Sequence, residues 1–273
     1  MLRRWCIPLA GLALVIGSVA ATAPAAAAGH APRAARTAAA GQLVRPTIIH
    51  LIRPAGTRPM ISHGFPHTAA TSTNWSGYAA TGRKFRSVSA SWTEPTGHCS
   101  GSGRKFSSFW VGIDGANSGT VEQTGSEVDC VGSSPRYFAW YEMFPAFPVN
   151  FSNRVRPGDH FSASVTHGSG AKYTLVIKDH TQHWSHIVHK SLRGAKNSSA
   201  EIIAEAPSTG SGHVLPLANF GTMHFSNAKA NGSKISNSRA FRIIMINNGG
   251  RPKDAVSSLS HGENFTVKWK HST

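Results

Sequence analysis

Residues 106–114 read Phe-Ser-Ser-Phe-Trp-Val-Gly-Ile-Asp, and this stretch carries the main clue to the fold. Side chains alternate between the two faces of a β-strand, so Val111 and Ile113 share one face. Trp110 and Asp114 lie together on the other. The aliphatic face predicts a strand packed on a hydrophobic core, whereas the opposite face combines an aromatic ring with a carboxylate.

The same arrangement recurs at residues 140–144, which read Trp-Tyr-Glu-Met-Phe. Alternation places Trp140, Glu142 and Phe144 on one face of this second strand. Aromatic side chains mixed with single carboxylates are typical of a substrate-binding cleft. The alternative is the edge of an aromatic core with surface acids, and the pattern alone favours neither.

Short apolar runs separated by Gly, Ser, Asn and Pro clusters continue through the rest of the chain, which contains 27 Gly and 15 Pro. Many strands with few helical runs predict an all-β sandwich or barrel. The runs expected as strands are Ser87–Trp92, Phe106–Ile113, Val121–Thr124, Tyr137–Phe144, His160–His167, Tyr173–Asp179, Trp184–His189, Ala200–Ala206, Met223–Phe225, Arg242–Asn247 and Asn264–Lys270.

The N-terminus resembles a secretion signal. Arg3 and Arg4 precede an apolar stretch from Ile7 to Ala21, and Ala-x-Ala cleavage sites follow up to Ala28. We therefore predict a signal peptide over residues 1–28 and a secreted, extracellular protein. The alternative, a membrane anchor, is disfavoured because the apolar stretch is short.

Residues 29–70 differ in composition from the rest of the chain. They are rich in Ala, Arg, Pro and His and contain no acidic residue, which predicts a propeptide or flexible basic linker. Residues 71–273 then form one β domain. If the segment is removed on maturation, the mature N-terminus should fall near Thr71 to Asn74.

The cysteines are few. Cys6 lies in the predicted signal peptide, which leaves Cys99 and Cys130. An even pair in an oxidising compartment predicts one disulfide. A catalytic cysteine is the weaker alternative, because neither residue lies in a setting that activates a thiol, such as a helix start.

The formal net charge is +16, but residues 71–273 hold 21 Lys and Arg against 12 Asp and Glu. A basic balance suits nucleic acid or an anionic polymer as partner. Because the charges are scattered and no nucleic-acid-binding motif occurs, a solvated surface is favoured. We expect no nucleic-acid partner, a monomer, and no stable membrane association once the signal is removed.

Common catalytic and metal-binding motifs do not occur in this sequence. It lacks His-Glu-x-x-His, Gly-x-Ser-x-Gly, a phosphate-binding loop and Asp-Thr/Ser-Gly. His180, His183, His186 and His189 recur every third residue, but in a hairpin this spacing alternates faces. The sequence therefore predicts no metal site, and no cofactor is implied.

The stretch 200–206, Ala-Glu-Ile-Ile-Ala-Glu-Ala, contains a candidate for proton transfer. Glu205 stands between two alanines beside aliphatic residues, and partial desolvation would raise its pKa. The alternative is a solvent-facing glutamate on a strand, which is the commoner case for an isolated glutamate.

Taken in order, six short segments resemble the glutamic peptidases, or eqolisins, over about 200 residues. The segments are Asn74–Gly77, Trp110–Gly115, Glu122–Gly125, Ala139–Glu142, Ala200–Glu205 and Ile246–Asn248. The resemblance implies two large antiparallel sheets packed as a curved, lectin-like sandwich with a cleft. It also implies an acid-acting endopeptidase with protein or peptide substrates.

Family motifs assign the catalytic pair to Gln123 and Glu205. Residues expected to line the cleft and bind substrate are Trp75, Trp110, Asp114, Trp140, Glu142 and Phe144. The rival class is a secreted module that binds a carbohydrate or another polymer without catalysis, since similar sandwiches bind glycans through aromatic faces. Such a module would need the tryptophans but not the pair Gln123 and Glu205.

Overall fold

A computed structural model describes residues 69–209 and 212–273. The predicted signal peptide and almost all of the predicted propeptide lie outside these residues. The described part begins slightly earlier than the expected domain, because its first strand starts at Ala70 rather than after residue 70.

Nearly all regular structure in the described residues is β-strand, which confirms the predicted all-β class. The strands are β1 (Ala70–Ser72), β2 (Trp75–Thr81), β3 (Ser87–Thr93), β4 (Arg104–Ile113), β5 (Val121–Val131), β6 (Ser134–Phe144), β7 (Val149–Asn150), β8 (His160–His167), β9 (Lys172–Asp179), β10 (Trp184–Ser191), β11 (Ser199–Glu205), β12 (Thr222–Ala230), β13 (Ser233–Lys234), β14 (Phe241–Met245), β15 (Asp254–Val256) and β16 (Phe265–Trp269). A short 3-10 helix, η1 (Ile235–Ser238), precedes β14.

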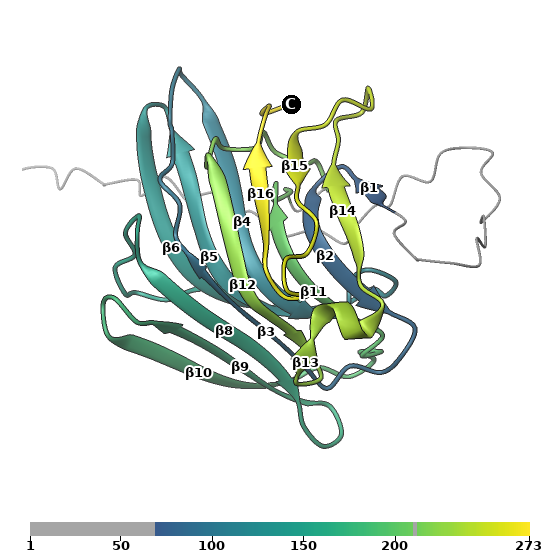
Figure 1. Cartoon of the computed structure of the whole chain (residues 1–273). Coiled ribbons are helices and arrows are strands. Elements are labelled where there is room, and N and C mark those ends of the chain that lie inside the picture. Colours follow the sequence, from purple (N-terminus) through teal and green to yellow (C-terminus); the bar gives the residue numbers. More distant parts are fainter. Residues whose placement is uncertain (1–68, 210–211) are drawn as a thin grey trace, which may run out of the picture. The chain divides into compact units, whose positions relative to one another are not determined.

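The strands form two large sheets that lie face to face (Figure 1). The first sheet has the order β1-β14-β2-β11-β4-β5-β6-β7. The second has the order β10-β9-β8-β3-β12-β16-β15, with β13 added beside β12. Neighbouring strands pair antiparallel, apart from β1 and β14, which pair parallel. The predicted β-sandwich is therefore confirmed.

The main core lies between the sheets. Val111 and Ile113 on β4 are fully buried there, together with Ile202 on β11 and Trp92 and Phe161 from the second sheet. This matches the aliphatic face predicted from alternation. A smaller buried cluster covers the opposite face of the first sheet and consists of Trp75, Ala79, Trp110, Ala116, Val121, Trp140, Ile203 and Ile243.

Two glycines explain why the predicted strands of the first sheet were incomplete. A Cβ atom on Gly77 would lie 2.2 Å from the Ile202 carbonyl oxygen, and one on Gly125 would lie 2.1 Å from that of Phe109. Neighbouring backbones approach so closely that only glycine fits. A glycine normally suggests a strand break, and the predicted strands accordingly omit β2 and end β5 at Thr124.

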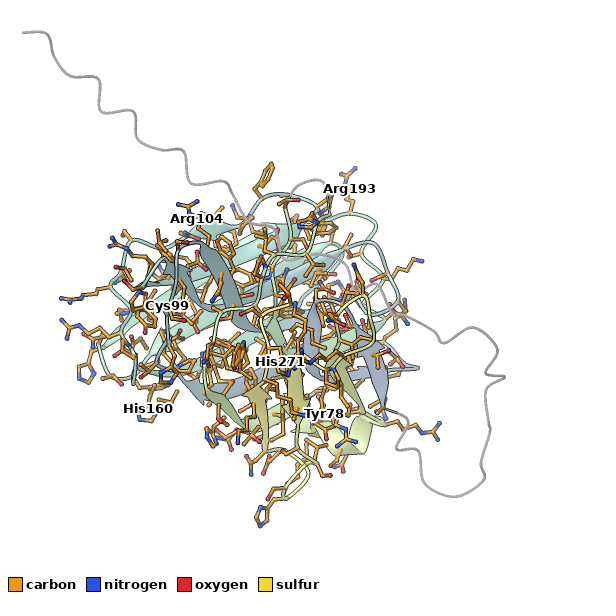
Figure 2. The ribbon with its side chains drawn as sticks, turned by 90° about the horizontal axis from the view of Figure 1, so that it is seen from above. Tyr78, Cys99, Arg104, His160, Arg193 and His271 are labelled. Carbon is orange, nitrogen blue, oxygen red and sulfur yellow. A yellow bond between two sulfur atoms is a disulfide. The ribbon has the colours of Figure 1, made fainter. Side chains whose placement is uncertain are left out.

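The longer β5 contains one of the two cysteines. Cys130 lies in β5, and the turn begins only after Val131. The predicted disulfide between Cys99 and Cys130 is confirmed (Figure 2 labels Cys99). It ties the loop before β4 to the end of β5 and closes a segment with a sequence separation of 31 residues.

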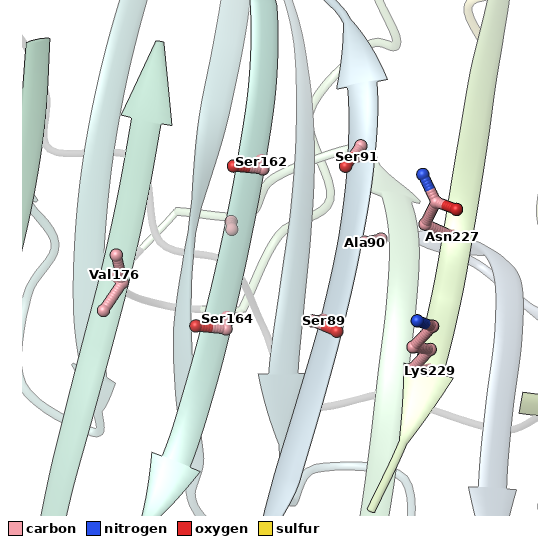
Figure 3. Close-up of a pocket in the computed structure, with 9 residues that line it drawn as sticks. Ser89, Ala90, Ser91, Ser162, Ser164, Val176, Asn227 and Lys229 are labelled. Carbon is pink, nitrogen blue, oxygen red and sulfur yellow. The ribbon is translucent and has the colours of Figure 1, made fainter. Parts of the chain in front are cut away.

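The outer face of the second sheet is polar. A shallow groove there is lined by small side chains such as Ser89 and Ser91 of β3 and Ser162 and Ser164 of β8, with Lys229 at one side (Figure 3).

Basic side chains are spread around the domain: Arg104, Arg193 and His160 lie on different sides in Figure 2. No helix within the described residues is long and apolar enough to cross a membrane.

Several carboxyl groups are buried away from water. Burial raises the pKa of Glu94 to about 8 and, with the added effect of nearby Asp114, the pKa of Glu122 to about 8. Burial also raises the pKa of Asp254 to about 7, although hydrogen bonds from the Ser76 hydroxyl and the Met245 N–H oppose the shift. The folded protein therefore keeps these carboxyls protonated at pH values where an unfolded chain ionises them.

We predict that the domain is more stable in acid than at neutral pH. Between about pH 4 and pH 8 the folded state binds protons that the unfolded chain has released, so stability falls as pH rises through this interval. The midpoint temperature of unfolding, Tm, should be lower at pH 8 than at pH 5 by about 5–10 °C. Differential scanning calorimetry across this range measures the shift.

Glu122→Gln provides the matched test, because it removes one buried ionisation with little change of shape. Its Tm should fall less between pH 5 and pH 8 than that of the wild type. An unchanged dependence of Tm on pH in this variant would show that Glu122 does not contribute.

Candidate active site

Strand register brings the two predicted catalytic residues to one face of the first sheet, the face turned away from the second sheet. Glu205 on β11 is paired with Trp75 of β2 and with Ser108 of β4. Gln123 on β5 is paired with Gly112 of β4 and with Glu142 of β6. Strand β4 therefore separates the strands that carry Glu205 and Gln123.

The carboxyl group of Glu205 is fully buried and receives hydrogen bonds on both oxygens. Trp110 Nε1 donates to Oε2 at 2.8 Å, and Asn74 Nδ2 donates to Oε1 at 3.3 Å. Donors to both oxygens stabilise the ionised form of a carboxyl group. Glu205 is thus held in a fixed orientation by donors that favour its ionised form.

Gln123 is also buried, and its side-chain amide is oriented by Glu142. Gln123 Nε2 donates to Glu142 Oε2 at 2.6 Å. Within the described residues, Gln123 Oε1 has no hydrogen-bond partner. This orientation leaves the carbonyl oxygen and the second N–H of the amide available to a bound molecule.

The indole of Trp110 connects the surroundings of the two residues. One end donates to Glu205, as described above. At the other end, a Cβ atom on Gly112 would lie 2.8 Å from Trp110 Cζ3 and 3.2 Å from Gln123 Cβ. The ring therefore extends from Glu205 to the side of Gln123, and it fits because residue 112 has no side chain.

The other predicted cleft residues on this face surround Trp110. Trp75 packs against it edge to face, with ring centroids 4.9 Å apart. Trp140 belongs to the same buried cluster, and half-buried Phe144 packs against that cluster.

Some buried polar atoms on this face have no hydrogen-bond partner among the described residues: Trp75 Nε1, Ser108 Oγ and Trp140 Nε1. Unsatisfied buried donors cost free energy, and they are typical of a site that a ligand completes.

Asp114 occupies a different position from the one predicted. Its φ angle is 71°, and its carboxylate accepts the backbone N–H groups of Lys196 and Asn197 at 2.7 Å and of Ser198 at 2.8 Å. These residues form the loop that leads into β11. Because its oxygens accept these loop N–H groups, Asp114 holds the loop that leads into β11 in place.

Glu201 lies on the same face of β11 as Glu205, but its surroundings differ. Burial raises the pKa of Glu201 well above its usual range, although the nearby Ser199 hydroxyl and Ala116 N–H lower it. Glu205 differs because an indole N–H and an amide N–H donate to its two carboxyl oxygens.

Sequence reasoning missed two residues near Glu205. Asn74 was part of a family segment but was not assigned to the site. Glu127 on β5 is paired with Ser108 of β4, which is paired in turn with Glu205 of β11. Burial and the nearby Asp129 and Glu205 raise the pKa of Glu127. Extending the alternation of β5 beyond Gly125 would have placed Glu127 on the face of Gln123, whereas no local pattern signals the Asn74 contact.

The histidine-rich hairpin is separate from this face. The side chains of His180 and His189 form hydrogen bonds with the hydroxyl groups of Ser162 and Thr174. The ring of His186 stacks on Phe151. In the part of the chain that the structure describes, no three His, Cys, Asp or Glu side chains are grouped as metal ligands.

Comparison with known proteins identifies the family. A model of the Peptidase A4 family matches residues 73–269, which is most of the chain. The chain belongs to this family. The resemblance to the glutamic peptidases seen in the sequence is thereby confirmed.

Two characterised members of the family are similar in sequence. Aspergillopepsin-2 of Aspergillus niger is 27% identical over 182 residues, and scytalidopepsin B of Scytalidium lignicola is 34% identical over 115 residues. The aligned segments cover 58% and 41% of this chain. They span 64% and 42% of the relatives, so the chain matches less than two thirds of the length of either protein.

Solved structures of the Peptidase A4 family share the sandwich. A crystal structure of scytalido-glutamic peptidase with a transition-state-analogue inhibitor superimposes with a TM-score of 0.63 and 25% identity, covering 72% of this chain and 98% of that one. Aspergilloglutamic peptidase from Aspergillus niger gives a TM-score of 0.51 at 25% identity, covering 61% and 99% of the two chains.

The assigned part of Asp114 is testable by an isosteric change. In Asp114→Asn, an amide group replaces one acceptor oxygen and faces backbone N–H donors, so the free energy of unfolding should fall by about 2–3 kcal/mol. Denaturant unfolding measures this loss.

The same chemical change at half-buried Glu263, which forms an ion pair with the exposed Lys234, is the control. Glu263→Gln should cost less than about 1 kcal/mol. Equal losses in the two variants would contradict the assignment.

Proposed function

We propose that this protein is a secreted endopeptidase that hydrolyses peptide bonds in acid with Gln123 and Glu205 as its catalytic pair. Support comes from one face of the first sheet. It combines a carboxylate fixed by two N–H donors with an amide whose carbonyl oxygen has no hydrogen-bond partner in the described residues. The family of the chain and the names of its relatives agree with this activity.

In the proposed reaction, Glu205 acts first as a base. Its carboxylate removes a proton from a water molecule as the water oxygen bonds to the carbonyl carbon of the substrate. Trp110 and Asn74 hold the carboxylate in one orientation, so little reorganisation is needed when the proton moves.

Gln123 stabilises the tetrahedral intermediate. The N–H of its amide that does not bind Glu142 donates to the oxyanion, and its carbonyl oxygen accepts a hydrogen bond from the attacking water. One oxyanion donor typically contributes about 3–4 kcal/mol to transition-state stabilisation. Glu142 keeps the amide in the orientation that this requires.

The protonated Glu205 then acts as an acid. It transfers its proton to the leaving nitrogen as the carbon–nitrogen bond breaks, and the carboxylate is regenerated. One carboxyl must be ionised at the start and hold a proton midway, which favours an acidic working pH.

The buried aromatic side chains on this face would contact the substrate. Three aromatic residues border the catalytic pair: Trp75 and Trp140 belong to the buried cluster of this face, and Phe144 packs against it. The indole N–H groups of Trp75 and Trp140 have no hydrogen-bond partner among the described residues, and they suit the carbonyl oxygens of a peptide backbone. Protein or peptide chains are the proposed substrates.

Secretion, maturation and monomeric state are part of the same proposal. The signal-like residues 1–28, the acid-free segment 29–70 and the disulfide between Cys99 and Cys130 support secretion followed by removal of a propeptide. Buried carboxyl groups with raised pKa values make the folded state more stable in acid. This suits an enzyme that works outside the cell at low pH.

Activity assays at about pH 3–5 on a denatured protein substrate test the pair. We expect proteolysis by the wild type, a loss of about 100-fold or more in kcat in Glu205→Gln, and a similar loss in Gln123→Ala. Full activity in either variant would eliminate the assigned pair.

Matched controls are Glu263→Gln and Gln182→Ala. Gln182 donates a hydrogen bond to Asp159 at the turn between β9 and β10. These two strands belong to the second sheet, so Gln182 is not part of this face. Both should keep wild-type activity. Polysaccharide binding without proteolysis at any pH would instead support the rival, a non-catalytic binding module.

Gly112→Ala tests the arrangement around Trp110. Its added methyl group would lie 2.8 Å from the Trp110 ring and must displace the ring or Gln123, so kcat/KM should fall by about 10–100-fold. Gly119→Ala is the control, because a Cβ there has no atom within 4 Å. Equal activity in the two variants would contradict the described packing.

A further inference from the structure

We infer that Asn74 is a positioning residue for Glu205, that Ser72 orients it, and that strand β1 is therefore part of the catalytic apparatus. This inference rests on the proposed function of Glu205. It is carried by a chain of hydrogen bonds that runs from the N-terminal edge of the first sheet to the catalytic carboxylate.

Ser72 fixes the orientation of the Asn74 amide. Its hydroxyl donates to Asn74 Oδ1 at 2.9 Å and accepts the backbone N–H groups of Asn74 at 3.2 Å and of Trp75 at 3.1 Å. Because the carbonyl oxygen of the amide is directed to Ser72, its NH₂ group points to Glu205 Oε1. Ser72 and Asn74 are both buried.

Backbone hydrogen bonds tie the same segment to two strands. Ser72 pairs with Met245 in the parallel β1–β14 ladder, and the Ile246 N–H donates to the Ser72 carbonyl oxygen at 2.8 Å. The Ala206 N–H donates to the Asn74 carbonyl oxygen at 2.8 Å. Asn74 is thus joined to β1 on one side and to the end of β11, directly after Glu205, on the other.

The contact matters because, apart from Arg104, the ionisable groups on this face around Glu205 are acidic and supply no positive charge to it. Those on the same face are Glu201 on β11, Glu127 and Asp129 on β5, and Glu142 on β6; Arg104 lies at the far end of β4. The residues that β2 turns to this face, Trp75, Gly77 and Ala79, carry no charge. The N–H donors of Trp110 and Asn74 favour the ionised form of Glu205.

The role of Ser72 and β1 also bears on where the propeptide is cleaved. Cleavage between Thr71 and Asn74, as predicted from the sequence, would remove or shorten β1 and release Ser72. The structure instead points to cleavage before Ala70, so that β1 remains paired with β14 in the mature enzyme.

The test compares the pH dependence of kcat/KM in variants of the full chain. Asn74→Asp keeps the shape of the side chain but replaces the donor with an acceptor. We expect kcat/KM at pH 4 to fall about tenfold or more, and the acidic limb of the profile to move to higher pH by about half a unit or more. Ser72→Ala, which frees the amide to rotate, should shift the profile in the same direction.

Thr73→Ala is the matched control, since it lies between these residues and should retain the wild-type profile. Mass spectrometry of the active form should find Ala70 retained. Calorimetry at pH 4 verifies folding, and if Asn74→Asp does not fold, the Ser72→Ala profile decides.

The two failures are distinguishable. Suppose that the wild type hydrolyses peptides and Glu205→Gln does not. An unshifted pH profile in folded Asn74→Asp then overturns this inference but leaves the proposed function standing. If Asn74→Asp does not fold, an unshifted profile in Ser72→Ala has the same meaning. An active form that begins after Ser72 would also overturn it, because it lacks the residue that orients Asn74. If Glu205→Gln retains full activity, the proposed function itself is wrong.

Discussion

The buried carboxylate of Glu205 is the constraint on which this face of the sandwich depends. An ionised group without partners in an apolar setting costs several kcal/mol, so the surrounding strands must supply donors. Trp110 does so from within β4 and Asn74 from the residue before β2, one on each oxygen. A polar group that is buried and satisfied in this way is rigid, which suits a base that must accept a proton in one direction.

That rigidity depends on how closely the central strands approach. Gly77 and Gly125 allow the backbones of neighbouring strands into contact, and Gly112 leaves room for the Trp110 ring beside Gln123. Such glycines disrupt the strand pattern in the sequence. Alternation therefore predicted β8 with its observed bounds, His160–His167, but missed β2, which Gly77 interrupts.

The candidate site was only partly predictable, for physical reasons. Alternation puts Glu201 and Glu205 on one face, and family resemblance was needed to select Glu205. The hydrogen bonds from Trp110 and Asn74 give a physical reason for that choice. Asn74 reaches Glu205 across 131 residues of sequence, a distance that no local pattern spans. Asp114 looked like a cleft residue because alternation cannot foresee that a left-handed φ angle ends the strand and turns its carboxylate to a loop.

A crystal structure with a peptide-based transition-state analogue would test the central claim most directly. The account predicts that the tetrahedral centre binds on the outer face of the first sheet. One of its oxygens should lie within about 2.6–3.2 Å of the Glu205 carboxylate and the other within the same distance of the Gln123 amide nitrogen. An analogue bound elsewhere, such as the serine-lined groove of the second sheet, or one that contacts neither side chain, would contradict it.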